Sequence, residues 1–362
     1  MAGVDMDDLL VVAPNFKQRL SGVTTTIVHL VPLQAKMIGI ATLGPASGLP
    51  DNLPKMRWRQ LPALLRRPRG SRYRVWHARR NVEMLGGAVL RYLFRAPLKL
   101  LFTSASQREH TGWTRFLVRR MDAVVATSRK TAAYLQVPNT VIMHGIDAER
   151  FHVPDDRGKA RADVGLDPDR LYAGCFGRVR RQKGTDLFVD AMIRLLPQHP
   201  QWSAIIAGRT TVEHRDFERG LRERIAAAGL ADRILFVGEH RDIERWYRAL
   251  SLFVAPQRWE GFGLTPLEAM ASGVPVVAAD VGAFSELIEQ DRTGVVVPAD
   301  DLGAMTAAAD AYMRDAGRCE AEGAAGRDHV SRNFALETEA VRLVEIYRRL
   351  ANGEDPGLRP AP

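Results

Sequence analysis

The segment at residues 172–186 places two cations between a predicted strand and a predicted helix. It reads Tyr-Ala-Gly-Cys-Phe-Gly-Arg-Val-Arg-Arg-Gln-Lys-Gly-Thr-Asp, with a buried strand expected to end at Phe176 and a helix to follow Lys183. Gly177 lets the backbone turn closely, and Arg178 comes next. Because a helix N-terminus and fixed cations both attract anions, the arrangement suits a diphosphate. The alternative is a charged loop without a ligand.

A second segment, residues 256–273, carries two glutamates eight positions apart. Glu260 lies in a loop after a predicted strand, and Glu268 in the first turn of a predicted helix. Glu268 has a structural alternative, because Thr265 and Glu268 match a capping box, in which the glutamate reaches back to the threonine amide. Glu260 has no such alternative and is predicted to contact a ligand. Three backbone amides are further candidates for binding phosphate oxygens, those of Gly263, Leu264 and Thr265.

Short apolar runs alternate with helical patterns along both halves of the chain. This alternation predicts an α/β fold with parallel sheets covered on both faces. Strands are expected at 9–13, 39–43, 74–77, 98–103, 123–127 and 140–143, and then at 172–176, 203–207, 234–237, 252–255, 274–278 and 294–297. Ligands of such sheets bind beyond the carboxyl ends of the strands, so a cleft between two such halves is the expected active site.

The expected division is into two Rossmann-like domains. They cover residues 1–152 and 170–335, and a polar segment rich in Pro, Gly and Asp, residues 153–169, is predicted to link them. A C-terminal helix and tail are expected over residues 336–362, with the helix near Thr338–Leu350. The length agrees with this division, because domains usually run to ~100–200 residues.

The composition excludes several classes of protein. Of 362 residues, 46% are hydrophobic and 26% charged, which is ordinary for a soluble globular protein. Two cysteines, Cys175 and Cys319, exclude a disulfide scaffold and indicate a reducing compartment. No apolar run reaches the ~18 residues of a spanning helix, and an acidic N-terminus is wrong for a secretory signal. We expect a cytoplasmic protein.

Positive charge is concentrated in the first half. Residues 1–152 contain 23 Lys and Arg against 9 Asp and Glu, and residues 55–120 contain 17 against 2. Such a field attracts phosphate-rich partners, among them anionic lipids, lipid-linked acceptors and nucleic acid. Nucleic acid is not expected, because the basic positions are not interleaved with stacking aromatic residues. The alternative is that these arginines lie on solvated faces.

Two strand ends of the first half carry further candidates. In the turn at residues 14–24, Gly22 is expected to let the backbone approach a donor sugar, or simply to make an ordinary turn. His77 and Arg79 come at the end of the third predicted strand, in the run Trp-His-Ala-Arg-Arg-Asn. They are expected to lie at the cleft, with a purely structural histidine as the alternative.

The two charged segments together resemble the retaining family-4 glycosyltransferases, which have the GT-B fold. In that fold two Rossmann-like domains face each other across a cleft. The similarity covers most of residues 9–300. It implies that Arg178 and Lys183 bind the donor diphosphate, that Glu260 contacts the donor hexose, and that Glu268 binds the ribose hydroxyls.

Two further positions follow from this resemblance. Residues 237–243, which include Gly238, stand where the family holds the nucleotide base. Family members often carry a histidine near the reacting sugar at the end of the next strand. Here that stretch reads Leu-Leu-Phe-Thr-Ser-Ala, so Ser104 stands roughly there, on the acceptor side.

Longer strings of the first half resemble the lipopolysaccharide core mannosyltransferases, at residues 19–27, 76–81, 100–105 and 119–128. This resemblance implies a GDP-mannose donor and an anionic glycolipid acceptor, lipid A carrying Kdo. Guanidinium groups match carboxylate and phosphate geometry, so several arginines are expected to bind the acceptor: Arg66, Arg67, Arg69, Arg79 and Arg80. Residues 87–95 form a basic amphipathic segment, expected to lie on the cytoplasmic face of the inner membrane, or alternatively to cover the sheet.

Neither a cofactor nor a metal site is expected. The Asp-x-Asp strings at residues 5–7 and 167–169 fall in a terminus and in the linker. The resemblance therefore implies that cations and helix amides, rather than a metal, neutralise the leaving diphosphate. Three alternatives stay open: a UDP-glucose or UDP-galactose donor, a nucleic-acid-binding module, and an inactive sugar-nucleotide sensor. The intact Arg, Lys and two Glu argue against the sensor.

Overall fold

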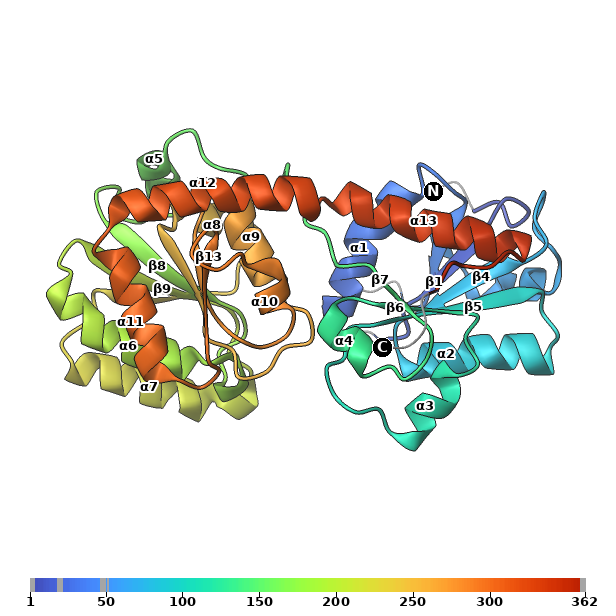
Figure 1. Ribbon diagram of the computed structural model, residues 1–362, viewed down its shortest axis with the longest axis horizontal. Coiled ribbons are helices and arrows are strands. Elements are labelled where there is room, and N and C mark those ends of the chain that lie inside the picture. Colours follow the sequence, from blue (N-terminus) through green and yellow to red (C-terminus); the bar gives the residue numbers. More distant parts are fainter. Residues whose placement is uncertain (1–3, 18–21, 46–49, 51, 359–362) are drawn as a thin grey trace. The chain divides into compact units, whose positions relative to one another are not determined.

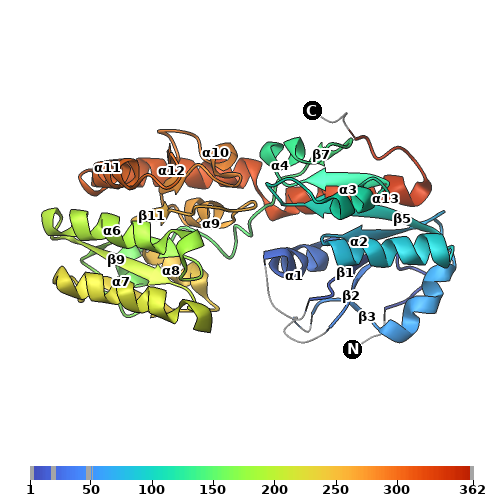
Figure 2. The same cartoon turned by 90° about the horizontal axis from the view of Figure 1, so that it is seen from below.

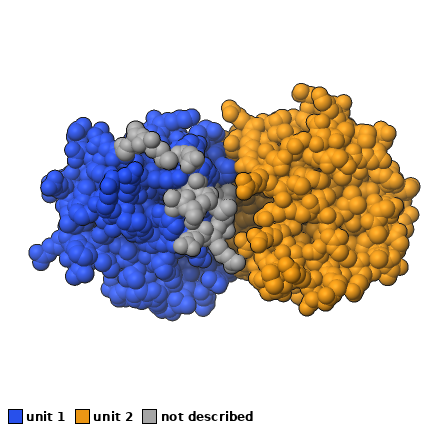
Figure 3. Space-filling view, turned by 180° about the vertical axis from the view of Figure 1, so that it is seen from behind, with its two compact units in different colours: residues 1–145, 336–362 blue, residues 146–335 orange. Residues whose placement is uncertain are grey.

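The chain divides into two compact units. The computed structural model describes residues 4–17, 22–45, 50 and 52–358. Residues 1–145 together with 336–362 form the first unit, and residues 146–335 form the second (Figure 3). The C-terminal helix and tail, expected as a separate segment over residues 336–362, are therefore part of the first unit.

The first unit is built on a parallel sheet in the order β3-β2-β1-β4-β5-β6-β7. Within the described residues its strands are β1 (Val11–Pro14), β2 (Ile40–Leu43), β3 (Lys55–Met56), β4 (Arg74–Ala78), β5 (Leu98–Ser104), β6 (Ala123–Ala126) and β7 (Thr140–Val141). The central strands are buried apolar runs, as a sheet covered on both faces requires. The predicted strands are all present, and the sequence missed only the edge strand β3, which is too short to carry a pattern.

Helices cover both faces of this sheet (Figures 1 and 2). They are α1 (Gly22–Gln34), the 3₁₀ helix η1 (Trp58–Leu65), α2 (Asn81–Ala88), the π-helical η2 (Val89–Leu93), α3 (Gly112–Val118), α4 (Arg129–Ala133) and α13 (Leu336–Asn352). Helices α1 and α13 pack on one face through residues such as Ile27 and Leu343. Helices α2 and α3 pack on the other through Met84 and Leu117. The buried side of α13 thus completes the first core.

The second unit has its own parallel sheet, in the order β10-β9-β8-β11-β12-β13. Its strands, among the residues described, are β8 (Leu171–Phe176), β9 (Trp202–Ala207), β10 (Ile234–Gly238), β11 (Leu252–Ala255), β12 (Val276–Ala279) and β13 (Gly294–Val297). Each matches a predicted strand. Since β8 pairs with both β9 and β11, the loops that follow these strands leave at one edge of the sheet.

Helices again lie on both faces of the second sheet. They are α5 (Arg157–Ala162), η3 (Arg181–Lys183), α6 (Thr185–Leu195), η4 (Leu196–Gln198), η5 (Val212–His214), α7 (Arg215–Ala227), α8 (Ile243–Ala249), α9 (Thr265–Ala271), α10 (Phe284–Leu287), α11 (Leu302–Met313) and α12 (Ala316–Asn333). Figure 1 shows α6, α7 and α11 on one face and α8, α9 and α12 on the other. Among the helices that the structure describes, none is long and apolar enough to cross a lipid bilayer.

The segment 153–169, predicted to be a linker, instead contains a packed helix. Asp156 caps α5 by accepting a hydrogen bond from a backbone amide of its first turn. Arg157 and Arg161 from this helix donate to main-chain carbonyl oxygens at the C-terminal ends of α8 and α9. A cation is favoured there because the carbonyl end of a helix carries partial negative charge. The segment is thus anchored to the second unit.

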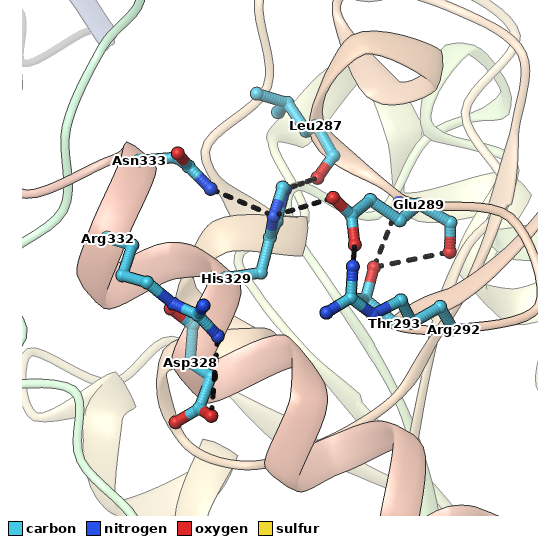
Figure 4. Close-up of polar contacts among 8 residues, drawn as sticks. All are labelled: Leu287, Glu289, Arg292, Thr293, Asp328, His329, Arg332 and Asn333. Carbon is cyan, nitrogen blue, oxygen red and sulfur yellow. Dashed lines mark hydrogen bonds and ion pairs between the residues drawn. The ribbon is translucent and has the colours of Figure 1, made fainter.

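The long helix α12 is tied to the loop that follows α10 (Figure 4). His329 Nε2 donates to the carbonyl oxygen of Leu287 (3.0 Å), and its Nδ1 lies 3.3 Å from the carboxylate of Glu289. Asn333 Nδ2 lies 3.1 Å from the same Nδ1. Glu289 also pairs with Arg292 (2.7 Å). These contacts hold the loop before β13 against α12.

Candidate active site

The loop after β8 turns sharply and then presents two cations. Gly177 has φ +141°, a backbone conformation that favours glycine. Arg178 follows it, is exposed, and has no hydrogen bond or ion pair with the described part of the chain. Lys183 ends the 3₁₀ turn η3, just before α6 begins. The predicted order of strand, glycine, two cations and helix is present.

The two charged segments meet in an ion pair. Lys183 Nζ donates to Glu260 Oε2, and the two side chains are only 21% and 20% exposed. The other carboxylate oxygen of Glu260 accepts a hydrogen bond from the amide of Gly261 (3.0 Å). Sequence reasoning assigned both residues to the site but did not predict that they pair. The pair sets a cation and a carboxylate side by side at the carboxyl edge of the second sheet.

Close packing around Glu260 fixes the loop that carries it. Gly263 has φ +87°, and a Cβ there would lie 2.3 Å from a ring carbon of Phe284 and 2.9 Å from Cγ of Glu260. The carbonyl oxygen of Phe262 accepts a hydrogen bond from the amide of Ala283 (3.0 Å). Only glycine fits at position 263, and its absent side chain leaves the room that Glu260 occupies.

Glu268 does not form the predicted capping box. Leu264 is the N-cap of α9 and Thr265 its first residue, without a side-chain cap. Glu268 Oε2 instead accepts a hydrogen bond from the hydroxyl of Tyr247 (2.7 Å), a buried residue of α8. Burial raises the pKa of the Glu268 carboxyl, and the hydrogen bond from Tyr247 and the charge of Arg150 offset part of that rise. The capping interpretation is therefore wrong, and a partner from a neighbouring helix holds this carboxylate.

The loop after β10 forms a compact turn. Gly238, exposed and with φ +83°, accepts a hydrogen bond from the amide of Gly208 (2.7 Å). His240 Nε2 donates to the carbonyl oxygen of Val237 (2.8 Å), and its ring lies 4.5 Å from that of Trp246. The segment predicted to hold the base is thus held by a contact within itself and by contacts with the loop after β9 and with α8, at the edge where β8 and β10 both end.

In the first unit, the structure buries His77 completely. Its Nδ1 lies 2.7 Å from the hydroxyl of Tyr347 in α13, and its Nε2 lies 2.7 Å from Oγ1 of Thr103 in β5. Burial, together with the charge of Arg79, holds the pKa of His77 well below its usual value, so the ring is neutral. A direct contact of His77 with an acceptor stays a prediction, and the observed contacts are those of a structural histidine.

Arg79, Arg80 and Ser104 also have internal partners. Arg80 donates to Asn15 (2.9 Å) and to Glu83 (2.7 Å), which ties the loop after β1 to the start of α2. The amide of Arg79 donates to Glu83 (2.8 Å), and its guanidinium is nearly buried. Ser104 is 2% exposed at the end of β5, and its hydroxyl accepts a hydrogen bond from the amide of Ser106 (3.4 Å). Gly22 begins α1, and residues 18–21 before it lie outside the described residues.

The first unit also contains a cluster that the sequence did not reveal. A cavity of about 10 Å³, roughly one water molecule, is bordered by His77, Arg79, His144 and Glu339 among others. Glu339 of α13 accepts hydrogen bonds from His144 (2.8 Å) and from the amide of Gly145 (2.8 Å). His77 and Arg79 are neighbours at the end of β4, but His144 and Glu339 join them from distant positions in the chain, so no local spacing signals the whole cluster.

A metal site is not evident in the part of the chain that the structure describes. Among those residues, no group of three or more His, Cys, Asp or Glu side chains is arranged to hold a metal ion. Metal independence stays a prediction.

Comparison with known proteins decides the family. Residues 170–315 match the family model described as "Glycosyl transferases group 1". Over 351 residues the chain is 62% identical to the lipopolysaccharide core biosynthesis mannosyltransferase LpsB of Rhizobium meliloti (strain 1021), covering 96% of this chain and 99% of LpsB. The chain belongs to this family of glycosyltransferases. A second mannosyltransferase of the same description, LpcC of Rhizobium leguminosarum bv. viciae, is 56% identical over 347 residues, covering 96% of this chain and 98% of LpcC.

A solved structure confirms the architecture of this glycosyltransferase. HepE of Anabaena, crystallised with UDP, superposes with a TM-score of 0.80 at 18% identity, covering 93% of this chain and 99% of HepE. At that identity the likeness shows the fold alone. The prediction of an α/β protein with the two Rossmann-like domains of the GT-B fold is confirmed, and so is the prediction of a glycosyltransferase.

Proposed function

We propose that this glycosyltransferase transfers mannose from GDP-mannose, with retention of configuration, to the Kdo-containing inner core of a lipopolysaccharide precursor. The names of LpsB and LpcC support the sugar and the acceptor class. The observation that carries the proposal is the Lys183–Glu260 pair. The pair brings together an ammonium, which can bind phosphate, and a carboxylate, which can bind sugar hydroxyls. It lies beyond the carboxyl ends of the strands, where doubly wound sheets bind their ligands.

Each donor-site residue has a proposed part in binding. Arg178, exposed and without a partner in the described chain, offers a planar guanidinium for two phosphate oxygens. Lys183 binds the same diphosphate as a point charge. Glu260 accepts hydrogen bonds from hexose hydroxyls. Glu268 accepts them from the ribose, with one of its oxygens already held by Tyr247.

Transfer breaks the bond between the hexose C1 and the diphosphate oxygen and forms one between C1 and an acceptor oxygen. We propose that both events occur on the same face of the sugar, which gives retention. The departing phosphate takes the proton of the acceptor hydroxyl. Arg178 and Lys183 stabilise the negative charge that develops on that phosphate, which is the task of preorganised donors in a transition state. No metal and no cofactor is needed for these steps.

The first unit supplies the proposed acceptor side. Arg66 and Arg67, at the end of η1, are exposed and therefore free to meet Kdo carboxylates or lipid A phosphates. Arg80 does not contact the acceptor in this proposal, because its guanidinium is hydrogen-bonded to Asn15 in the loop after β1 and to Glu83. We propose that Arg80 and His77 hold the loops of the acceptor side in place.

A surface of α2, η2 and α3, here called the α2–α3 patch, supports a proposed contact with the cytoplasmic face of the inner membrane. Large apolar side chains are exposed on it: Val82, Leu85, Val89, Tyr92, Leu93, Phe94, Trp113 and Phe116. The two helices are joined by a hydrogen bond from Asn81 to Thr114 (2.8 Å). Exposed arginines lie among the apolar positions, namely Arg95, Arg115 and Arg119. Apolar side chains with interspersed cations suit an anionic bilayer.

The test is a donor-by-acceptor assay with purified enzyme. GDP-mannose, UDP-glucose and UDP-galactose are each offered to lipid A with and without Kdo, in EDTA and in magnesium. We expect transfer from GDP-mannose to the Kdo-containing acceptor, unchanged by EDTA. Transfer from a UDP-hexose and not from GDP-mannose would overturn the proposed donor. Transfer to lipid A without Kdo would overturn the proposed acceptor. Loss of activity in EDTA with recovery in magnesium would overturn the metal-free mechanism.

A further inference from the structure

Arg258, two positions before Glu260, connects the two loops of the donor site. Its backbone amide donates to the carbonyl oxygen of Gln182 (3.0 Å), the residue next to Lys183. Its guanidinium donates to the carbonyl oxygen of Arg181 (2.6 Å). Arg258 is therefore hydrogen-bonded to two successive carbonyl groups, those of Arg181 and Gln182, in the turn that carries Lys183.

The same guanidinium is anchored to two carboxylates. It donates to both oxygens of Asp186, in the first turn of α6, at 2.7 and 3.0 Å. It also donates to Asp300, in the loop after β13, at 2.6 Å. The Arg258 and Asp186 side chains are only 19% and 12% exposed. A bidentate, partly buried pair of this kind is directional and holds its geometry better than an exposed pair.

The backbones of the two loops touch beside this anchor. Gly184 has φ +70°, and a Cβ at this position would lie 1.8 Å from the carbonyl oxygen of Pro256. No other residue fits without moving one loop. Arg258 on one side and this glycine contact on the other thus fix the distance between the loops, and with it the separation of Lys183 and Glu260.

We propose that Arg258 is a positioning residue for the Lys183–Glu260 pair, with Asp186 as its anchor. Its guanidinium is occupied by protein groups, so it acts on the reaction through Lys183 and Glu260 and not by touching the donor. The inference rests on the proposed function, because it presumes that these two residues bind the sugar nucleotide. A misplacement of about 1 Å in such a site can cost ~10²-fold in rate.

The decisive experiment is a double-mutant cycle on kcat/KM for the donor, with thermal unfolding of every variant. We expect Arg258→Ala to lower kcat/KM by ~10–10²-fold, and Arg258→Lys, which keeps the charge but loses the fork, to recover part of it. When Lys183 is already replaced by alanine, adding Arg258→Ala should lower kcat/KM by less than about a further threefold. Arg318→Ala is the matched control, since Arg318 also binds two acidic residues, Glu322 and Asp291, elsewhere in the second unit.

The outcomes separate the two proposals. Normal kcat/KM in Arg258→Ala, with Lys183→Ala impaired, would overturn the positioning role alone. An equal loss from Arg258→Ala with and without Lys183 would also overturn it, because the residue would then act independently. A Lys183→Ala variant with normal kinetics would overturn the proposed donor site itself. If Arg318→Ala loses as much activity as Arg258→Ala at a similar unfolding temperature, the effect is general destabilisation and the inference fails.

Discussion

Lys183 Nζ and the carboxylate of Glu260 form an ion pair that joins loops 77 residues apart in the sequence. Both side chains are largely buried, and Gly184, next to Lys183, is where the backbones of the two loops approach each other. In the proposed function the pair opens toward the donor, with the ammonium turning to phosphate and the carboxylate to sugar hydroxyls. Substitution of each residue in turn separates these two roles.

Removing either donor-site cation should slow the reaction strongly with little effect on stability. For Lys183→Ala and for Arg178→Ala we expect turnover to fall by ~10²–10³-fold, since each removes a donor to developing charge. Single-turnover transfer from GDP-mannose measures the chemical step directly. Near-normal turnover in both variants would refute the phosphate assignment.

Glu260→Gln should reduce turnover while the protein stays folded. A carboxylate accepts stronger hydrogen bonds from hydroxyl groups than an amide does, and the difference of about 1–1.5 kcal/mol corresponds to roughly 5–10-fold in rate. The loss of a partly exposed ion pair should change the free energy of unfolding by less than about 1 kcal/mol. GDP binding by calorimetry serves as the control, because it should survive if Glu260 contacts only the hexose.

Glu268 should make donor binding weaker at low pH. Burial raises the pKa of its carboxyl, so this group takes up a proton at a higher pH than an ordinary glutamate does. Protonation removes an acceptor for the ribose, and KM for the donor should therefore rise as the pH falls, beginning at a higher pH than a glutamate of ordinary pKa would cause. Glu268→Gln should bind the donor weakly at every pH and lack this rise. If KM for the donor rises equally at low pH in wild type and in Glu268→Gln, a group other than Glu268 is responsible for the rise.

His77 should make the first unit sensitive to acid. Its pKa is lowered in the folded state, so the unfolded chain takes up a proton that the buried ring does not. The stabilising contribution is thus complete above about pH 6.5 and is lost as the pH falls toward the lowered value. Thermal unfolding at several pH values should show a flatter dependence for His77→Gln than for wild type, while His152→Gln, a change at an exposed histidine, leaves the dependence intact.

The α2–α3 patch should bind anionic membranes. Leu93→Glu combined with Phe94→Glu should weaken co-sedimentation with phosphatidylglycerol vesicles by about tenfold or more, since each buried apolar side chain contributes about 1.5–3 kcal/mol. Val212→Glu is a matched control, because Val212 and Leu93 are both 72% exposed and Val212 lies in the second unit. Equal binding by the double variant and wild type would place the membrane contact elsewhere.

Much of the fold was predictable from local patterns. A strand buried on both faces is a short apolar run, and a helical segment between two such runs leaves few arrangements other than a parallel sheet. The helix α5 was missed because Arg157 and Arg161 are polar in sequence. Their partners are carbonyl groups at the ends of α8 and α9, which no local pattern can reveal.

Local sequence patterns were enough to predict the two-domain α/β architecture, the succession of strands along the chain and which charged residues stand at the strand ends. How those residues pair depends on contacts between distant parts of the folded chain. Glu268 is hydrogen-bonded to Tyr247 and does not form the capping box considered as its alternative, and Thr103 and Tyr347 are the partners of the two ring nitrogens of His77. The reason is physical: composition and spacing fix which groups reach the edge of a sheet, whereas hydrogen-bond partners are set by elements that the chain brings together over long sequence distances.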